Sequence, residues 1–265
     1  MTEKEYRSHP AVSRSELWKM SESPEKFKWH KENPQEPTPS LLFGQFIHSM
    51  ILTPGIVWDE FTVAPDVDRR TKEGKKTYWE WLESIGEKKP VTIEMAADAV
   101  NMYETIKRTP LALKLLSGET ELPLFWKDEM TGEECKCRLD SFVRKGEKLI
   151  IVDYKTTDNA ETEAFTRSAI QYGYDLQVAM YSEGVKANYG VDPIFVFVAQ
   201  EKKPPYAINI LQADELMFRR GYDLYREYLG MYHECKETGN WYGYMGSQNM
   251  INNLSLPAWL AKEFE

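Results

Sequence analysis

The sequence has few cysteines, no long apolar run and no excess of positive charge. Its three cysteines are an odd number without the spacing of a disulfide framework. No apolar run approaches the roughly 20 residues that a membrane-spanning helix requires. The opening residues MTEKEYRSHP contain no apolar signal region. We therefore expect a soluble protein that resides in the cytoplasm.

The charge balance narrows the class of protein. The formal net charge is −9, which argues against a protein that coats nucleic acid with its whole surface. The net charge does not reveal a local basic groove or a bound metal ion, so nucleic-acid binding at one site stays open. The 265 residues are 42% hydrophobic, which is enough for one large domain with a well-buried core.

The pattern along the chain changes from helical to strand-rich near residue 119. A capped helix start at Ser13 is followed by a proline-rich linker, and the basic stretch 69–76 is expected to be a mobile loop. We expect a helical N-terminal region over 1–118 and a core over 119–265, together forming one compact domain. The predicted helices are 41–52, 78–116 with interruptions near Gly86 and Pro90, 165–188 and 214–236, and the predicted strands are 121–126, 134–144, 148–155, 194–200 and 205–211.

Two acids and a lysine on neighbouring predicted strands are the most informative residues. Asp140 lies on one strand, and Asp153 and Lys155 lie on the next. Side chains alternate between faces along a strand, so Asp153 and Lys155 share one face while Tyr154 points to the other. A divalent cation held by Asp140 and Asp153, with Lys155 beside it, would form a hydrolytic centre. The alternative is an ordinary salt bridge at a strand end.

A predicted helix downstream carries further polar residues at a helical spacing. Gln177 and Tyr181 lie one above the other on one face, together with Ile170 and Tyr174. The alternative interpretation is an amphipathic core helix with polar tips. On the strand of Asp140, Cys135 and Cys137 share the opposite face with Leu139, which indicates that both cysteines are packing residues.

This order of elements, with an acid on the second strand and Asp-x-Lys on the third, resembles the PD-(D/E)xK superfamily of nucleases. The Gln177-x-x-x-Tyr181 element is similar to one that follows the Asp-x-Lys strand in RecB-like and lambda-type exonucleases. The string from Tyr6 to Leu17 is similar to the start of RecE-like, exodeoxyribonuclease VIII-like proteins of phages and prophages. The resemblance implies an α/β fold with a restriction-endonuclease-like core, a mixed central sheet flanked by helices, and a helical N-terminal extension.

The resemblance also implies roles for individual residues. Related proteins carry a metal-facing histidine on an upstream helix, often after a glycine one turn earlier, and His48 with Gly44 is the counterpart here. A structural histidine is the alternative. Glu121 matches the glutamate that precedes the acid-bearing strand, although Glu119 competes for this role. The implied metal ligands are His48, Glu121, Asp140, Asp153 and the backbone carbonyl of Tyr154, and the implied catalytic residues are Asp140, Asp153, Lys155, Gln177 and Tyr181.

The activity that the resemblance implies is a Mg²⁺-dependent deoxyribonuclease, with Mn²⁺ able to substitute. The reaction would be 5′–3′ exonuclease digestion of double-stranded DNA in phage-type recombination. The alternatives are a structure-specific or nicking endonuclease of the same fold, and a non-catalytic DNA-binding protein. The implied partners are duplex DNA, a single-strand annealing recombinase and further copies of the chain in a ring. No iron–sulfur cluster is expected, because three cysteines cannot supply the four ligands it needs.

Overall fold

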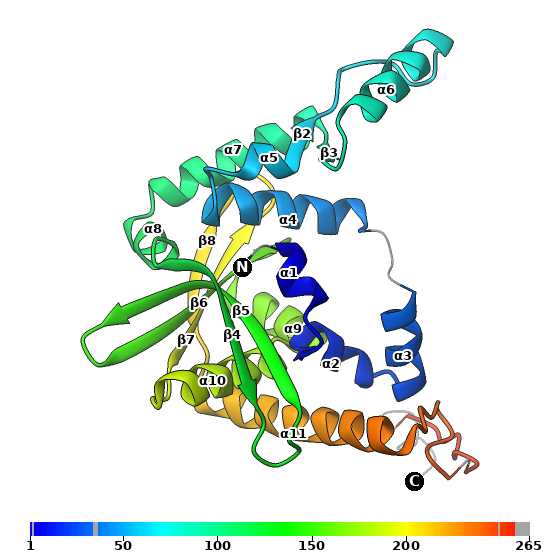
Figure 1. Cartoon of the computed structure of the whole chain (residues 1–265). Helices are drawn as coiled ribbons and strands as arrows, with labels where there is room; N and C mark the ends of the chain where they lie inside the picture. Colours follow the sequence, from blue (N-terminus) through cyan, green and yellow to red (C-terminus); the bar gives the residue numbers. More distant parts are fainter. Residues whose placement is uncertain (2, 34–36, 249, 258–265) are drawn as a thin grey trace.

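The computed structural model describes residues 1, 3–33, 37–248 and 250–257. In this part of the chain, a mixed sheet of six strands lies at the centre, with helices packed on both faces (Figure 1). The antiparallel meander of β4, β5 and β6 confirms the sequence prediction. Strand β7 runs parallel to β6, and β8 pairs antiparallel with β7 at the edge. The strands of this sheet are β1 (Val12–Ser13), β4 (Glu119–Lys127), β5 (Glu134–Lys145), β6 (Lys148–Thr157), β7 (Ile194–Glu201) and β8 (Ile208–Gln212).

Strands β5 and β6 separate partway along their length. Their pairing runs from the turn at Gly146, whose φ of 61° suits a glycine, to the pair Ser141 and Val152, where it stops. Asp140 and Asp153 are the next residues on their strands, so both acids stand where the strands diverge. We call this place the fork. Further along β5, the short strand β1 is its neighbour in place of β6.

Helices α4, α7 and α8 cover the face of the sheet to which Tyr154 points. Helix α4 begins close to its predicted start because the Thr38 side chain caps its first turn. Phe46 and Ile47 of α4 are fully buried in one cluster with Tyr154, and His48 makes an edge contact with the same ring, 5.1 Å between centroids. This packing brings α4 across the fork. The elements in this layer are α4 (Pro39–Leu52), α5 (Val57–Glu60), α7 (Ile93–Lys107) and α8 (Pro110–Leu116).

On the other face, the predicted single helix over 165–188 is wrong. Two helices, α9 and α10, meet at Gly173, which has a φ of 64°. The ring of Trp18 packs so closely against Gly173 that a Cβ atom has no room there. Ile170 therefore lies on α9, 38% exposed, and does not align with Gln177. The helices on this side are α9 (Thr162–Gln171), α10 (Tyr174–Tyr189) and α11 (Glu215–Thr238).

The N-terminal segments pack beside α10 and α11. Ser13 and Glu16 form the predicted capping box, with the Ser13 N–H donating to Glu16 Oε2 at 2.8 Å. Of the predicted proline-rich linker, Pro34 lies outside the described residues and Pro39 opens α4. No helix among the described residues is both long and apolar enough to cross a membrane. The segments are α1 (Glu3–Ser8), α2 (Arg14–Met20) and α3 (Pro24–Glu32).

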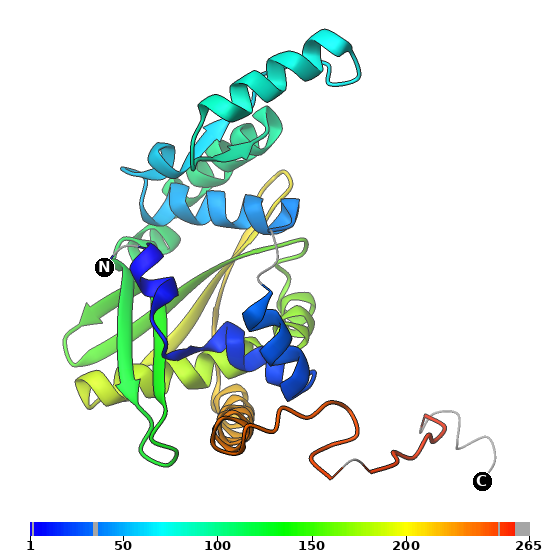
Figure 2. The ribbon, with the colours of Figure 1, turned by 45° about the vertical axis from the view of Figure 1, so that its right-hand side comes forward.

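Residues 64–88 form an arm that projects from the body, as Figure 2 shows. At its base, β2 (Phe61–Val63) and β3 (Lys89–Val91) pair in parallel as a separate two-stranded sheet, which the sequence did not predict. The expected mobile loop over 69–76 is wrong from residue 72 onward, because α6 (Lys72–Ser84) begins there. The Thr71 hydroxyl accepts the Gly74 N–H at 3.0 Å and caps this helix.

Candidate active site

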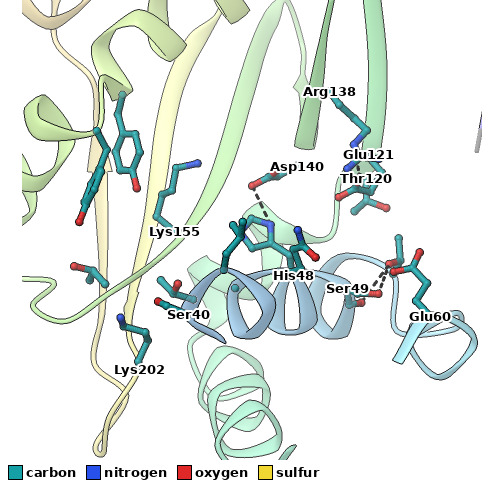
Figure 3. A pocket seen from close by; sticks show the side chains of 18 of the residues that line it. Ser40, His48, Ser49, Glu60, Thr120, Glu121, Arg138, Asp140, Lys155 and Lys202 are labelled. Atoms are coloured by element: carbon teal, nitrogen blue, oxygen red, sulfur yellow. Dashed lines mark hydrogen bonds and ion pairs between the residues drawn. The ribbon is translucent and has the colours of Figure 1, made fainter. Parts of the chain in front are cut away.

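A cavity of about 1530 Å³ lies where α4 crosses the fork (Figure 3). His48 from α4, Glu121 from β4, Asp140 from β5 and Lys155 from β6 all line it. Tyr181 of α10 lines it as well. The fold therefore brings residues from five distant segments to one place, and Asp153 and Gln177 are buried next to this group.

Asp140 is held at the fork by the backbone of the neighbouring strand. Its Oδ2 atom accepts the N–H of Tyr154 at 2.8 Å, so the side chain replaces the strand pairing that has ended one residue earlier. The same oxygen lies 3.6 Å from His48 Nδ1. Burial raises the pKa of Asp140, while the charge of Lys155 opposes this shift.

Asp153 is almost completely buried, with 2% of its surface exposed. Gln177 Nε2 donates to its Oδ1 atom at 2.5 Å, and Lys155 Nζ lies 2.5 Å from its Oδ2 atom. The ammonium group of Lys155 therefore neutralises this oxygen at close range. Burial raises the pKa of Asp153 against the influence of Lys155. Both oxygens of this carboxylate are thus engaged by neighbouring side chains.

Lys155 is positively charged in this site. Burial disfavours the ammonium form, but the carboxylates of Asp153 and Asp140 outweigh burial, and the pKa of Lys155 is raised. Its Nζ atom also lies 4.9 Å from the centre of the Tyr174 ring. The strand alternation predicted from the sequence is therefore observed: Asp153 and Lys155 meet on one face, while the Tyr154 hydroxyl donates to Gln200 in the core.

His48 is neutral near pH 7. Burial, and next the charge of Lys155, lower its pKa to about 4. Its contact with Asp140 is consequently not an ion pair between two charges, and the imidazole keeps a lone pair that could bind a metal ion. The Gly44 position one turn earlier is open, because a Cβ atom there would meet nothing within 4 Å.

Glu121 lies at the rim of the cavity in an uncommon backbone conformation. Its φ is 53°, and it stands opposite Asp140 between the paired positions Thr120–Ser141 and Leu122–Leu139. Its Oε2 atom forms an ion pair with Arg138 Nε at 2.6 Å. Glu119, the competing residue, does not line the cavity, and its Oε2 lies 3.7 Å from Arg144 at the surface.

Gln177 and Tyr181 lie one turn apart on α10, at the spacing that the sequence indicated. Gln177 contacts Asp153 directly, whereas Tyr181 borders the cavity. Burial raises the pKa of the Tyr181 hydroxyl well above its usual range, so the phenol is protonated. Tyr174, one turn earlier, lies between Lys155 and the apolar cluster around Phe197.

Two arginines near the site were missed by the sequence analysis. Arg138 lies two residues before Asp140 on the same strand face, so strand alternation could have identified it. Arg14 stacks on the rings of Trp18 and Tyr174, at 5.8 and 5.7 Å, and donates to the Tyr172 carbonyl. Its buried Nε atom has no hydrogen-bond partner among the described residues. No sequence signal connects Arg14 with this site, because the contact is purely tertiary.

The chemistry of these side chains fits a hard divalent cation. The buried carboxylate of Asp153 and the partly exposed carboxylate of Asp140 share the ammonium group of Lys155. The third neighbour, His48, is a neutral imidazole. Carboxylate oxygens are the preferred ligands of Mg²⁺ and Mn²⁺. In the described part of the chain, however, no three His, Cys, Asp or Glu side chains already stand together as a metal site. The side chains present are of the kind that binds Mg²⁺, but in the described residues no three of them stand close enough together to hold one ion.

The cysteines do not contribute to this site. Cys135 and Cys137 are buried on the face of β5 opposite Asp140, as predicted. Burial raises the pKa of the Cys135 thiol to about 12 and that of Cys137 further. Both thiols are therefore inert packing groups.

Comparison with known proteins identifies the fold. Residues 13–253 match the family described as "PDDEXK-like domain of unknown function (DUF3799)". A solved structure named "Putative exonuclease", from Eubacterium rectale, is similar over 98% of this chain and 97% of its own, with 18% identity and a TM-score of 0.66. A second, SSO0001, is similar over 86% of this chain and 81% of its own, with 13% identity and a TM-score of 0.38. The search of curated proteins gave no match. The expected restriction-endonuclease-like α/β fold is confirmed.

Proposed function

The chain belongs to the family of PDDEXK-like domains (DUF3799), and on that premise we propose that it is a metal-dependent deoxyribonuclease that hydrolyses phosphodiester bonds. One observation carries the proposal. At the fork, the buried Asp153–Lys155 ion pair stands beside Asp140 and the neutral His48 on a single open cavity. A structural salt bridge would not require a second acid and a histidine at 3.6 Å from each other on the same cavity.

The proposed metal ligands are Asp140, Asp153 and His48, with the Tyr154 carbonyl and Glu121 at the flank. When bound, a Mg²⁺ or Mn²⁺ ion would polarise the scissile phosphate and lower the pKa of a water molecule. Two of these carboxylates already have a cationic partner, Asp153 in Lys155 and Glu121 in Arg138. A bound cation would compete with Lys155 and Arg138 for these two side chains.

The remaining residues supply positioning and charge. Lys155 is a fixed cation at the cavity wall, where it orients the attacking water and stabilises negative charge that develops on the phosphate. Asp153 fixes Lys155, and the amide of Gln177 fixes Asp153 in turn. Tyr181 borders the space into which the DNA strand would enter.

We further propose that the preferred reaction is 5′–3′ exonuclease digestion of double-stranded DNA. The resemblance of residues 6–17 to RecE-like proteins and the name of the Eubacterium rectale structure support this choice. A single-strand annealing recombinase would receive the exposed strand. A homo-oligomeric ring would enclose the duplex. A basic inner surface of such a ring could contact the DNA although the chain as a whole is acidic.

The test is digestion of linear duplexes labelled at either end, beside a covalently closed circle, in Mg²⁺. We expect the linear DNA to be degraded from its 5′ ends while the circle stays intact. Nicking of the circle would show the endonuclease alternative. A lack of cleavage in Mg²⁺ and Mn²⁺, together with retained DNA binding, would show the non-catalytic alternative.

A further inference from the structure

The arm carries a strip of exposed side chains that the candidate active site does not use. Lys72, Lys75, Lys76 and Trp79 recur on α6 at intervals of three and four residues, so they lie on one face of the helix. We call these four residues the lysine strip. All four are exposed, and Trp79 is 59% exposed. Lys76 lies 3.6 Å from Glu80 at the surface, whereas Lys72 and Lys75 have no ion-pair partner in the described part of the chain.

The tip of the arm is folded, which distinguishes it from a solvated basic loop. Arg70 pairs with Asp68 at 3.2 Å, and the Arg69 guanidinium stacks on the Tyr78 ring at 4.7 Å. Together with the Thr71 cap, these contacts fix the start of α6. Both arginines are exposed but have a partner within the arm, and Lys72 and Lys75 do not form an ion pair with any described residue. Cations fixed on a helix lose less conformational entropy on binding than cations on a mobile loop.

The base of the arm is part of the cavity wall. Phe61 of β2 and Lys89 of β3 are paired in register, and both line the cavity. Lys89 Nζ lies 5.2 Å from the Phe61 ring and donates to Gln45 of α4 at 3.1 Å. The 13 residues of α6 span about 20 Å. At 3.4 Å per nucleotide, this is the length of about six base pairs.

We propose that the lysine strip binds the phosphate backbone of duplex DNA outside the cavity and holds a substrate whose end is in the cavity. This inference rests on the proposed nuclease function and adds the binding surface for the uncut duplex. Helix α6 carries three lysines and three glutamates, and the chain has a net charge of −9. The attraction to phosphate therefore comes from the lysine face of the helix and not from a net charge of the helix or the chain. An anionic lipid surface fits less well, because an interfacial helix lies flat in the membrane plane and α6 stands away from the body (Figures 1 and 2).

The test compares two variants with the same loss of charge. One carries Lys72→Gln, Lys75→Gln and Lys76→Gln, and the control carries Lys114→Gln, Lys145→Gln and Lys148→Gln on exposed positions outside the arm. Binding to DNA hairpins of about 5 and 20 base pairs is measured by fluorescence anisotropy in Ca²⁺ over 50–200 mM salt. The shorter duplex is shorter than the length of about six base pairs that α6 spans, and the longer one extends well beyond that length.

With the longer hairpin, the arm variant should lower the slope of log affinity against log salt by about 2.7, because each phosphate contact contributes about 0.9. Between 50 and 200 mM salt, the DNA affinity of the wild type should therefore fall about 40-fold more than that of the arm variant. Binding of the short hairpin should be unchanged in both variants. The control variant should behave as the wild type with both hairpins.

Three results would overturn the inference. An unchanged slope in the arm variant, or an equal loss in the control, would remove the strip from the DNA path. A change in oligomeric state caused by Trp79→Ala, measured by sedimentation with DNA binding intact, would assign the strip to contacts between copies of the chain. If the wild type binds neither hairpin, the proposed nuclease function itself fails, which is a different outcome from a failure of the arm alone.

Discussion

Replacing Lys155 with alanine tests the central contact of the site. The change removes the cation that lies 2.5 Å from the buried Asp153 carboxylate and leaves that carboxylate without its ion-pair partner. Loss of a preorganised charge that stabilises the phosphate typically costs about 10²–10³ in kcat. We therefore expect Lys155→Ala to hold DNA in Ca²⁺ with wild-type affinity and to digest a linear duplex in Mg²⁺ at least a hundredfold more slowly under single-turnover conditions.

The same variant should show a characteristic pattern of stability. Removing one partner of a buried ion pair costs about 3–5 kcal/mol, and the lower end applies here because the Lys155 side chain is 17% exposed. For a chain of this size about 3 kcal/mol corresponds to a fall in Tm of roughly 6–12 °C. A cation bound between the two carboxylates replaces the missing charge, and Ca²⁺ at about 100 times its Kd returns about 2.7 kcal/mol. Differential scanning calorimetry with and without Ca²⁺ measures both effects.

Lys202→Ala is the matched control. Lys202 lines the same cavity, but its partner is the exposed carboxylate of Asp158 at 2.8 Å, and such pairs contribute at most about 1 kcal/mol. Its rate and Tm should stay close to those of the wild type. Digestion by Lys155→Ala at the wild-type rate would refute the catalytic interpretation of Asp153 and Lys155 and leave an ordinary salt bridge in its place.

Three further variants or conditions test the rest of the site. Gln177→Ala removes a hydrogen bond to the charged Asp153, worth about 1.5–3 kcal/mol, so kcat should fall roughly 10- to 150-fold in single-turnover assays while DNA affinity in Ca²⁺ is retained. His48→Ala should weaken Mn²⁺ binding in calorimetric titration without a change in Tm of the metal-free protein, and an unchanged affinity would exclude His48 as a ligand. In the wild type, Mg²⁺ and Mn²⁺ should support turnover and Ca²⁺ should bind without turnover, because the site offers mainly carboxylate oxygens. Faster digestion in Zn²⁺ than in Mg²⁺ would contradict that donor assignment.

Local patterns predicted the centre of the molecule well. The meander of β4, β5 and β6 depends on turn residues and on alternation within each strand, and both can be recognised in a single sequence. The same alternation placed Asp140, Asp153 and Lys155 on the correct strands. The pairing of Gln177 with Asp153 needed more information, since helical spacing shows which side chains share a face but not which strand they meet.

The errors arose where distant residues decide the local structure. The break between α9 and α10 depends on Trp18, whose ring packs against Gly173 from the N-terminal segment. The start of α6 depends on the Thr71 cap and on the close approach of the Asp68 backbone to Gly74. The basic composition of this segment, taken alone, indicated a loop. The ion pair between Arg138 and Glu121 was not predicted, because it depends on the register between β4 and β5. The roles assigned to these site residues stay predictions.

The fork gives one backbone amide an unusual partner. In a continuously paired strand, an N–H group donates to the carbonyl of its neighbour, but the Tyr154 amide donates to the Asp140 carboxylate at 2.8 Å. A proton in a charge-assisted bond of this kind is sensitive to the charge of its acceptor. The ¹H–¹⁵N resonance of Tyr154 is therefore a spectroscopic probe inside the site, present in the unmodified protein.

This probe reports on the acid without any substrate. Titration with Mg²⁺ should shift the Tyr154 resonance if the cation draws charge from Asp140, and Asp140→Ala should speed deuterium exchange of this amide far more than that of its neighbours on β6. Val152, paired with Ser141 just before the strands diverge, provides the internal reference. Nuclear magnetic resonance can thus follow occupation of the site through a single backbone proton that donates to Asp140.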